Sequence, residues 1–382
     1  MKTLRIWIAA TLVALRAAVA LHAETWAEAL KDLTDRQVLA GAVTLVADKD
    51  KVLETQASGW ADIGKQIPMK PDTVFWIASQ TKGVTGAALM MLVDEGKVSL
   101  DDPVAKHIPK LKELWVIERM EGDRMTLVKA KTPVTVRHVM SHTGGFPFLS
   151  PQEQKIDTMP LREKISVYAQ TPLVAEPGTK YQYSNVGINI AGYIIEVVSG
   201  MPYEEFMRKR LFEPLGMTDT GFWLTPGQEA RLAQNYRPNA DKTALEQAPI
   251  GYLTYPFTDR ANRYAEPGGG LFSTAHDVMR FCQMLLNGGV LDGKRLLSES
   301  AVRALGTKQT GRVEADYGLG FETHGWGFKH GGAQGTQMRI NVERGLVTVY
   351  LVQHAGFTKG NEREGHAAPN TFSDLTIKQF CK

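Results

Sequence analysis

The chain places strand-like segments at its two ends and long helix-like segments between them, and this order restricts the fold more than any other feature. Residues 42–47 and 52–57 are short runs rich in β-branched residues around a polar turn, which predicts a hairpin. Residues 338–342 alternate in polarity, turn after Arg344 and continue into the apolar run 346–352, which predicts a second hairpin. Because strands at both ends of a chain are most easily satisfied in one sheet, we predict a discontinuous sheet with a helical region inserted in it.

The middle of the chain carries three segments with helical periodicity. The first follows Ser79 and ends at Gly96, and the second spans roughly residues 186–198. The third begins at Thr274, whose spacing to Asp277 fits a capping box. Together with the two hairpins, these segments predict an α+β fold.

The first residues of the chain resemble a secretory signal. Lys2 and Arg5 precede an apolar run at 6–15, which is half of the roughly 20 residues that a membrane-spanning helix needs. We therefore expect cleavage of residues 1–23, no stable membrane span, and a secreted or periplasmic protein. Removal of this segment takes away three basic residues and no acidic one, which leaves 41 of each sign. No basic surplus remains to attract nucleic acid, so we expect no nucleic-acid partner.

The cysteines and histidines do not form a recognisable metal motif. Cys282 and Cys381 are too few for a disulfide scaffold and are not in a Cys-x-x-Cys pair, so the sequence allows one bridge or two unpaired thiols. His138 and His142 have the i, i+4 spacing of a metal pair, but no third ligand is evident. We expect two structural histidines and no metal site.

Serine chemistry is indicated by two motifs in order. None of the twelve serines has glycine two residues before it, so the Gly-x-Ser-x-Gly elbow is absent. Ser-x-x-Lys occurs once, at Ser79 and Lys82, against about 0.75 matches expected by chance from the residue frequencies. Tyr-x-Asn also occurs once, at Tyr183 and Asn185, against about 0.26 expected. The second motif is therefore the more informative.

A third motif, His-x-Gly, occurs three times and gains meaning only from its position. At His330 it leads through Gly331, Gly332 and Ala333 toward the alternating segment of the second hairpin. At the other two places it lies in a glycine turn or follows the last strand. Position therefore favours the copy at His330.

These three motifs, in this order, resemble those of the class C β-lactamase and penicillin-binding-protein serine hydrolases, which include family VIII-type carboxylesterases. The connecting segments 135–145, 177–179 and 212–217 are also similar to that family, and the likeness covers most of residues 40–355. The resemblance implies a β-lactamase/transpeptidase-like fold, with an antiparallel sheet flanked by helices and a mostly helical inserted domain. It also implies an acyl-enzyme hydrolase with no metal or organic cofactor.

The domain division follows from the strand order and this resemblance. We expect residues 24–78 and 300–382 to form a discontinuous sheet domain and residues 79–299 to form the helical domain. The active site is expected at the interface between the two.

The residue types suit acyl transfer. Ser79 and Lys82, one helical turn apart, lie on one face within about 5–6 Å, and a buried lysine near a helix start is pushed toward its neutral, basic form. Tyr183 is expected to share the acid and base work, either as a phenolate or as a proton shuttle. The alternatives without a catalytic role are a helix-capping serine, a solvated lysine and a packed tyrosine.

The resemblance also assigns binding roles. It pairs the backbone N–H of Ser79 with that of Ala333, expected on the late strand, as an oxyanion hole. Gly331 and Gly332 would let substrate approach that strand closely. Asn185 would contact the acyl side chain and the lysine network, although it could instead be a turn residue.

The substrate is expected to be a small molecule, an ester, amide or β-lactam. In the β-lactamases and peptidases that the chain resembles, the third motif normally begins with lysine, which attracts a carboxylate. His330, mostly neutral near pH 7, would hold an anionic substrate less strongly, so we favour hydrolysis of an ester with a small or medium acyl group. A β-lactamase or D-alanyl-D-alanine carboxypeptidase and a non-catalytic penicillin-binding sensor stay open as alternatives.

Overall fold

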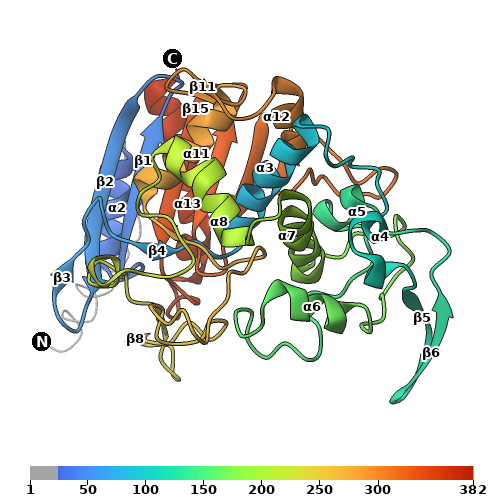
Figure 1. Cartoon of the computed structure of the whole chain (residues 1–382). Helices are drawn as coiled ribbons and strands as arrows, with labels where there is room; N and C mark the ends of the chain where they lie inside the picture. The colour runs from blue at the N-terminus through green and yellow to red at the C-terminus, as the bar shows by residue number, and fades with distance from the viewer. Residues whose placement is uncertain (1–24, 382) are drawn as a thin grey trace, which may run out of the picture.

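The structure, a computed structural model, describes residues 25–381, so the predicted signal segment lies outside the described residues. Its main sheet has seven antiparallel strands in the order β12-β13-β14-β15-β1-β2-β3 (Figure 1). The strands of this sheet are β1 (Gly41–Ala47), β2 (Val52–Asp62), β3 (Ile67–Pro68), β12 (Glu322–His324), β13 (Gly327–Gly331), β14 (Gln337–Asn341) and β15 (Leu346–Val352). Pairing of β1 with β15 confirms the predicted single sheet built from both ends of the chain.

Helices cover both faces of this sheet, and the strand alternation explains how. In β1, Ala42 and Val46 pack with α2 (Trp26–Asp35) and α13 (Glu362–Phe380) on one face. Val43 and Leu45 belong to the larger core on the other face, where α11 (Ala275–Leu286) lies against β1, β14 and β15. A strand with both faces covered must be apolar throughout, and every residue of β1 is buried.

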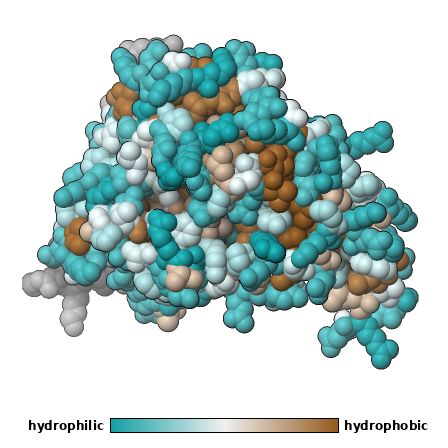
Figure 2. Space-filling view, in the orientation of Figure 1, coloured by the Kyte–Doolittle hydropathy of each residue, from teal (hydrophilic) through white to brown (hydrophobic). Residues whose placement is uncertain are grey.

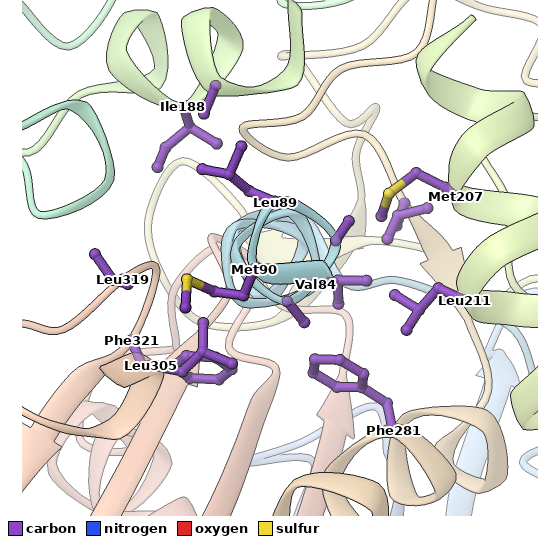
Figure 3. Packing of buried hydrophobic residues seen from close by; sticks show 14 of the residues in the cluster. Val84, Leu89, Met90, Ile188, Met207, Leu211, Phe281, Leu305, Leu319 and Phe321 are labelled. Atoms are coloured by element: carbon purple, nitrogen blue, oxygen red, sulfur yellow. The ribbon is translucent and has the colours of Figure 1, made fainter. Parts of the chain in front are cut away.

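The helix that follows Ser79 is the central helix of the molecule. It is α3 (Thr81–Asp94), and its residues from Thr81 to Leu92 are all buried. Figure 3 shows α3 along its axis, with Ile188 of α7 (Asn185–Ser199) on one side and Phe281 of α11 on another. A helix that is apolar all round must be enclosed on every side, so α3 is held between the sheet and the remaining helices.

The remaining elements complete the helical region and its loops. They are α4 (Val104–His107), α5 (Val136–Met140), α6 (Leu161–Tyr168), α8 (Tyr203–Met207), α9 (Glu213–Leu215), α10 (Pro226–Glu229), α12 (Glu299–Gly306), and the short turns η1 (Ala78–Gln80), η2 (Pro109–Leu111) and η3 (Arg208–Phe212). Four small antiparallel pairs are β4 (Phe75–Trp76) with β9 (Phe272–Ser273), β5 (Trp115–Glu121) with β6 (Arg124–Lys129), β7 (Tyr236–Pro238) with β8 (Leu245–Gln247), and β10 (Val290–Leu291) with β11 (Lys294–Arg295).

The predicted elements compare well with these bounds. Both hairpins and all three predicted helices are present, and Thr274 caps α11 by accepting from the amide of Asp277 at 3.3 Å. Strand β13 was not predicted as a separate strand. The domain boundaries stay a prediction, although α11 packs on the sheet while its residues fall within the predicted helical domain.

The β5–β6 hairpin projects from the body of the molecule at the lower right of Figure 1. Apolar side chains are exposed on it, and Figure 2 shows a lightly brown patch over this region. Across residues 25–381, no helix has the length and the apolar character needed to cross a membrane.

Candidate active site

Ser79 lies in η1, the turn that connects β4 to α3. The chain just before the turn is fixed by two hydrogen bonds: Ile77 donates its amide to the carbonyl of Leu271 at 3.0 Å, and the indole of Trp76 donates to the carbonyl of Gly269 at 2.6 Å. Ala78 has a φ of 47°, a left-handed value that is unusual for a residue with a Cβ atom. The chain therefore holds a strained backbone immediately before Ser79, a feature that clusters at functional sites.

Lys82 lies one turn further on and points back to Ser79. Its Nζ atom donates to Ser79 Oγ at 3.1 Å and to the carbonyl oxygen of Gly268 at 2.5 Å. Burial lowers the pKa of Lys82 to about 7, while the negative charge of Glu266 raises it in part. The amine is thus close to the serine hydroxyl and available in its neutral form near neutral pH.

Tyr183 completes a three-residue cluster from a distant part of the chain. It lies in the loop before α7, and Lys82 Nζ is 4.7 Å from the centre of its ring. Burial raises the pKa of Tyr183 well above its ordinary value, and a hydrogen bond with Ser79 lowers it in part. The three side chains predicted from separate motifs therefore meet, and the tyrosine is a neutral phenol there.

His142 is a fourth member of this region that the sequence analysis treated as structural. Its ring centre is 4.5 Å from that of Tyr183 and 4.7 Å from that of Tyr317. The Nδ1 atom accepts from the amide of Ser184 at 3.2 Å, whereas the buried Nε2 atom has no partner within residues 25–381. Burial, and next the charge of Lys82, lower its pKa well below the ordinary value, so the ring is neutral.

His138, the other histidine of the i, i+4 pair and also expected to be structural, caps α5, where its Nδ1 atom accepts from the amide of Thr135 at 3.3 Å. No group of three metal-ligating side chains exists in the described part of the chain. The signal that could have identified His142 is its His-x-Gly sequence. Its φ of 60° places it in a tight turn beside the tyrosine.

His330 is brought to the cluster but is enclosed by protein. Its Nδ1 atom donates to the carbonyl of Gly331 at 2.6 Å, so Nε2 must accept, and it does so from the hydroxyl of Tyr317 at 3.0 Å. Burial and then the charge of Lys82 lower its pKa to about 3. A neutral histidine with both nitrogens engaged supplies no fixed charge, and its role in substrate binding stays a prediction.

The glycines after His330 bring the end of β13 against the turn that holds Ser79. A Cβ atom on Gly332 would lie 2.5 Å from the carbonyl oxygen of Ile77 and 2.2 Å from Thr336 Oγ1, so only glycine fits there. Ala333 was expected on the strand, and this is wrong: β13 ends at Gly331 and Ala333 lies in the turn to β14. The turn arises because the amide of Gly332 donates to Thr336 at 2.7 Å and closes the hairpin.

The two amides predicted as an oxyanion hole have no protein acceptor. Neither the N–H of Ser79 nor that of Ala333 donates to another group in residues 25–381. Asn185, the first residue of α7, is buried beside Gly268, where an added Cβ atom would lie 2.9 Å from its Cγ. Its Oδ1 atom also has no partner among the described residues. Asn185 therefore borders the loop that receives the Lys82 amine.

The cysteines play no part in this site. Both lie in the described part of the chain, and they form no disulfide. Cys282 is buried in α11, and burial raises the pKa of its thiol. The choice left open by the sequence is thus decided in favour of two unpaired thiols.

The fold and the serine–lysine–tyrosine cluster together indicate a serine hydrolase. A sequence model of the Beta-lactamase family matches residues 26–369, and the chain belongs to that family. The β-lactamase/transpeptidase-like fold and the hydrolase class that the motifs implied are thereby confirmed.

Three similar proteins illustrate the range of the family. Protein Rv1367c of Mycobacterium tuberculosis (strain ATCC 25618 / H37Rv) is 32% identical over 362 residues, covering 85% of this chain and 88% of that protein. A Salmonella typhimurium protein named "Putative D-alanyl-D-alanine carboxypeptidase" is 30% identical over 270 residues, covering 66% of this chain and 60% of its own. The structure of EstCE1, "a hydrolase with promiscuous acyltransferase activity", superposes with a TM-score of 0.74 at 22% identity, covering 94% and 99% of the two chains.

Proposed function

We propose that this protein is a carboxylesterase-type serine hydrolase that forms a covalent acyl-enzyme on Ser79. The observation that carries the proposal is the convergence of Ser79, Lys82 and Tyr183 in one cluster, in which Lys82 is buried and the other two are partly exposed. Lys82, the group of the three with a pKa of about 7, is the general base for the serine hydroxyl. Tyr183 acts as a neutral proton shuttle, because its raised pKa opposes the phenolate alternative.

The proposed reaction runs in two halves. Ser79 Oγ forms a bond to the ester carbonyl carbon while its proton passes to the Lys82 amine, and the amides of Ser79 and Ala333 hold the resulting oxyanion. Collapse breaks the bond to the alcohol oxygen, which receives a proton from Lys82 through Tyr183. Water then attacks the acyl-enzyme, and the same groups work in reverse to release the acid and restore the serine hydroxyl.

The preference for esters rests on the charges near the cluster. His330 is neutral and buried where a lysine would supply a carboxylate-binding charge, and the negative charge of Glu322 reaches far enough to raise the pKa of Tyr183. The cation next to His330 is Lys329, which lies 3.3 Å from Glu322 and is paired with it. A substrate carboxylate would thus meet no unpaired cation there, whereas an uncharged ester would lose nothing.

A D-alanyl-D-alanine carboxypeptidase is the second candidate, supported by the name of the Salmonella relative. It would use the same serine, lysine and tyrosine on an amide with a terminal carboxylate. Export through residues 1–23 is part of either proposal and places the enzyme outside the cytoplasm.

A substrate panel tests the proposed function. Purified protein assayed on p-nitrophenyl esters of increasing acyl length, nitrocefin and a D-Ala-D-Ala peptide is expected to show the highest kcat/KM on short or medium esters. Because no unpaired cation lies near His330 among the described residues, we expect kcat/KM to be at least about tenfold lower on nitrocefin and the D-Ala-D-Ala peptide, both of which carry a carboxylate. Faster peptide or nitrocefin turnover would favour the second candidate or a β-lactamase, and labelling without turnover would indicate a sensor.

The pKa of Lys82 predicts how activity depends on pH. The neutral amine is the reactive form, so kcat/KM on a neutral ester should be low below pH 6, rise through a midpoint of about 7 and level off above it. A stopped-flow series in buffers of constant ionic strength measures this limb. A profile that is flat from pH 5 to 9 would argue against Lys82 as the base.

A further inference from the structure

A cluster of buried charges lies behind Lys82, and the proposed reaction does not use it. The ammonium of Lys164, on α6, lies 2.8 Å from a carboxylate oxygen of Glu153 and 2.6 Å from one of Glu266. The three side chains are at most 1% exposed. Two carboxylates around one ammonium leave an excess negative charge, and uncompensated charge is costly to bury. The amine of Lys82 responds to this charge, because Glu266 raises its pKa.

The same cluster is connected to Lys82 through the backbone. Glu266 lies two residues before Gly268, whose carbonyl accepts from Lys82 Nζ at 2.5 Å. The amide of Gly268 donates to Asn189 Oδ1 at 3.1 Å, and Asn189 Nδ2 donates to the hydroxyl of Tyr168 at 2.9 Å. The hydroxyl of Tyr168 in turn donates to the carboxylate of Glu153, the member of the cluster that lies on the loop before α6. A continuous set of hydrogen bonds thus fixes the carbonyl that orients the amine.

The loop between Glu266 and Gly270 has little freedom to adopt another shape. The hydroxyl of Thr85, on α3, lies 2.9 Å from the carbonyl oxygen of Pro267. The amide of Gly270 donates to the carbonyl of Glu266 at 2.8 Å. Gly192, on α7, packs so closely that a Cβ atom on it would lie 2.3 Å from the Pro267 ring. The position of the Gly268 carbonyl is therefore set by its surroundings on both sides.

We propose that Glu266 is a positioning residue for Lys82, acting through the loop that presents the Gly268 carbonyl and through its own negative charge. The inference rests on the proposed function, because it concerns the amine that removes the serine proton. When Lys82 is protonated, its charge balances the excess carboxylate of the cluster. When Lys82 is neutral, the excess negative charge is relieved if Glu266 is protonated, so the proton occupancies of the two groups depend on each other.

The electrostatics of Lys82 agree with this coupling, and those of Glu266 reflect its burial and its charged neighbours in the cluster. Burial raises the pKa of Glu266 to about 7; Lys164 lowers it and Glu153 raises it. Among the described residues, Glu266 is the carboxylate whose charge raises the pKa of Lys82. Both groups therefore titrate in the same pH range, which is the range in which a general base must work.

Within residues 25–381, Glu266 is the carboxylate whose charge acts on Lys82, and no second one takes its place. The titratable and charged groups that face Glu266 are Lys164 and Tyr168 from α6, Glu153 from the preceding loop, Lys82 from α3 and Tyr203 from α8. Those that face Lys82, besides Ser79 and Glu266, are Tyr183, His142 and His330. The two histidines are neutral, as shown above.

Glu266→Gln tests the proposal because it removes the charge and keeps the shape. Without the negative charge the pKa of Lys82 falls, so the acidic limb of kcat/KM on a neutral ester should move to lower pH by about one unit. We expect the plateau of kcat/KM at high pH to change little while the midpoint of the acidic limb moves. An active variant whose limb coincides with that of the wild type would overturn the proposal.

A matched control separates the effect of the lost charge on Lys82 from a general loss of stability. Asp157→Asn also neutralises a fully buried carboxylate, one that binds Arg263 at 2.7 Å in a neighbouring loop. It should lower thermal stability and leave the limb in place. A limb that moves as far with Asp157→Asn as with Glu266→Gln would also overturn the proposal.

A second variant keeps the test decisive if Glu266→Gln does not fold. Glu153 raises the pKa of Glu266, so Glu153→Gln should leave Glu266 more fully ionised and move the limb to higher pH, opposite to the first variant. A limb that stays or moves to lower pH would contradict the coupling. Failure of the proposed function is distinct: it would show as ester hydrolysis that survives the loss of Ser79, whatever the limb does.

Discussion

Ser79→Ala is expected to lower kcat on a p-nitrophenyl ester by about 10⁴-fold or more, because no other hydroxyl can accept the acyl group at that place. The serine lies 3.1 Å from the Lys82 amine and follows the strained residue Ala78, so its neighbours hold it for attack. The measurement is steady-state hydrolysis together with intact-mass spectrometry after a short reaction. The wild type should carry one acyl group and the variant none.

Ser199→Ala is the matched control for this experiment. Ser199 lies at the far end of α7 and donates to the carbonyl of Ile195 at 2.6 Å, so its loss removes one serine hydroxyl without touching the cluster. Its rate and its acyl adduct should match the wild type. If Ser79→Ala keeps more than a few per cent of the activity, or still becomes acylated, the nucleophile has been assigned to the wrong residue.

Tyr183→Phe is expected to lower kcat by about 10²- to 10⁴-fold while changing KM little, because it removes one proton-transfer group and keeps the ring. The ring packs against His142 and Phe148, with centres 4.5 and 6.0 Å away, so phenylalanine should keep the packing. The loss should be smaller on esters with a good leaving group such as p-nitrophenol, which needs little protonation, than on alkyl esters. Rates on both kinds of ester measure this difference.

Tyr181→Phe is the control for the shuttle. Tyr181 is two residues away and also contacts the ring of His142, with centres 5.8 Å apart, but it makes no contact with Lys82 in the described structure. Its variant should hydrolyse both kinds of ester within about threefold of the wild type. Equal losses of hydrolysis rate in the two variants would mean that the region is sensitive to any lost hydroxyl, and this would contradict the shuttle role.

The histidines around Tyr183 are uncharged, and this sets the electrostatics of the site. The rings of His142 and His330 lie beside the tyrosine, with centres 4.5 and 6.3 Å from that of Tyr183, and burial keeps both histidines uncharged. Lys82 is therefore the one cation in contact with the phenol in the described structure. A site of this kind stabilises charge that moves during the reaction rather than charge that the substrate brings, which fits an uncharged ester.

Local sequence patterns were sufficient for the elements that local rules govern. Alternation and β-branching identified the strands of both hairpins, and glycine stops and capping residues identified α3, α7 and α11. The spacing of Ser79 and Lys82 also fixed their contact, because one helical turn determines it. Strand β13 was missed as a separate strand because its segment begins and ends with glycine, and pairing with β12 and β14 makes it a strand.

Long-range packing decided the rest of the site. The sequence placed Ala333 on a strand, yet the closure of the hairpin by Gly332 and Thr336 puts it in a turn. No spacing rule relates residues from five separate segments, so Glu266 had no signal of its own, and the His-x-Gly sequence at His142 did not indicate that it lies beside Tyr183. The chain alone determined which side chains could carry acyl chemistry. Burial, which only the folded chain provides, lowers the pKa of the lysine, raises that of the tyrosine and keeps the histidines neutral, because the charged form of each group is what a dry interior penalises.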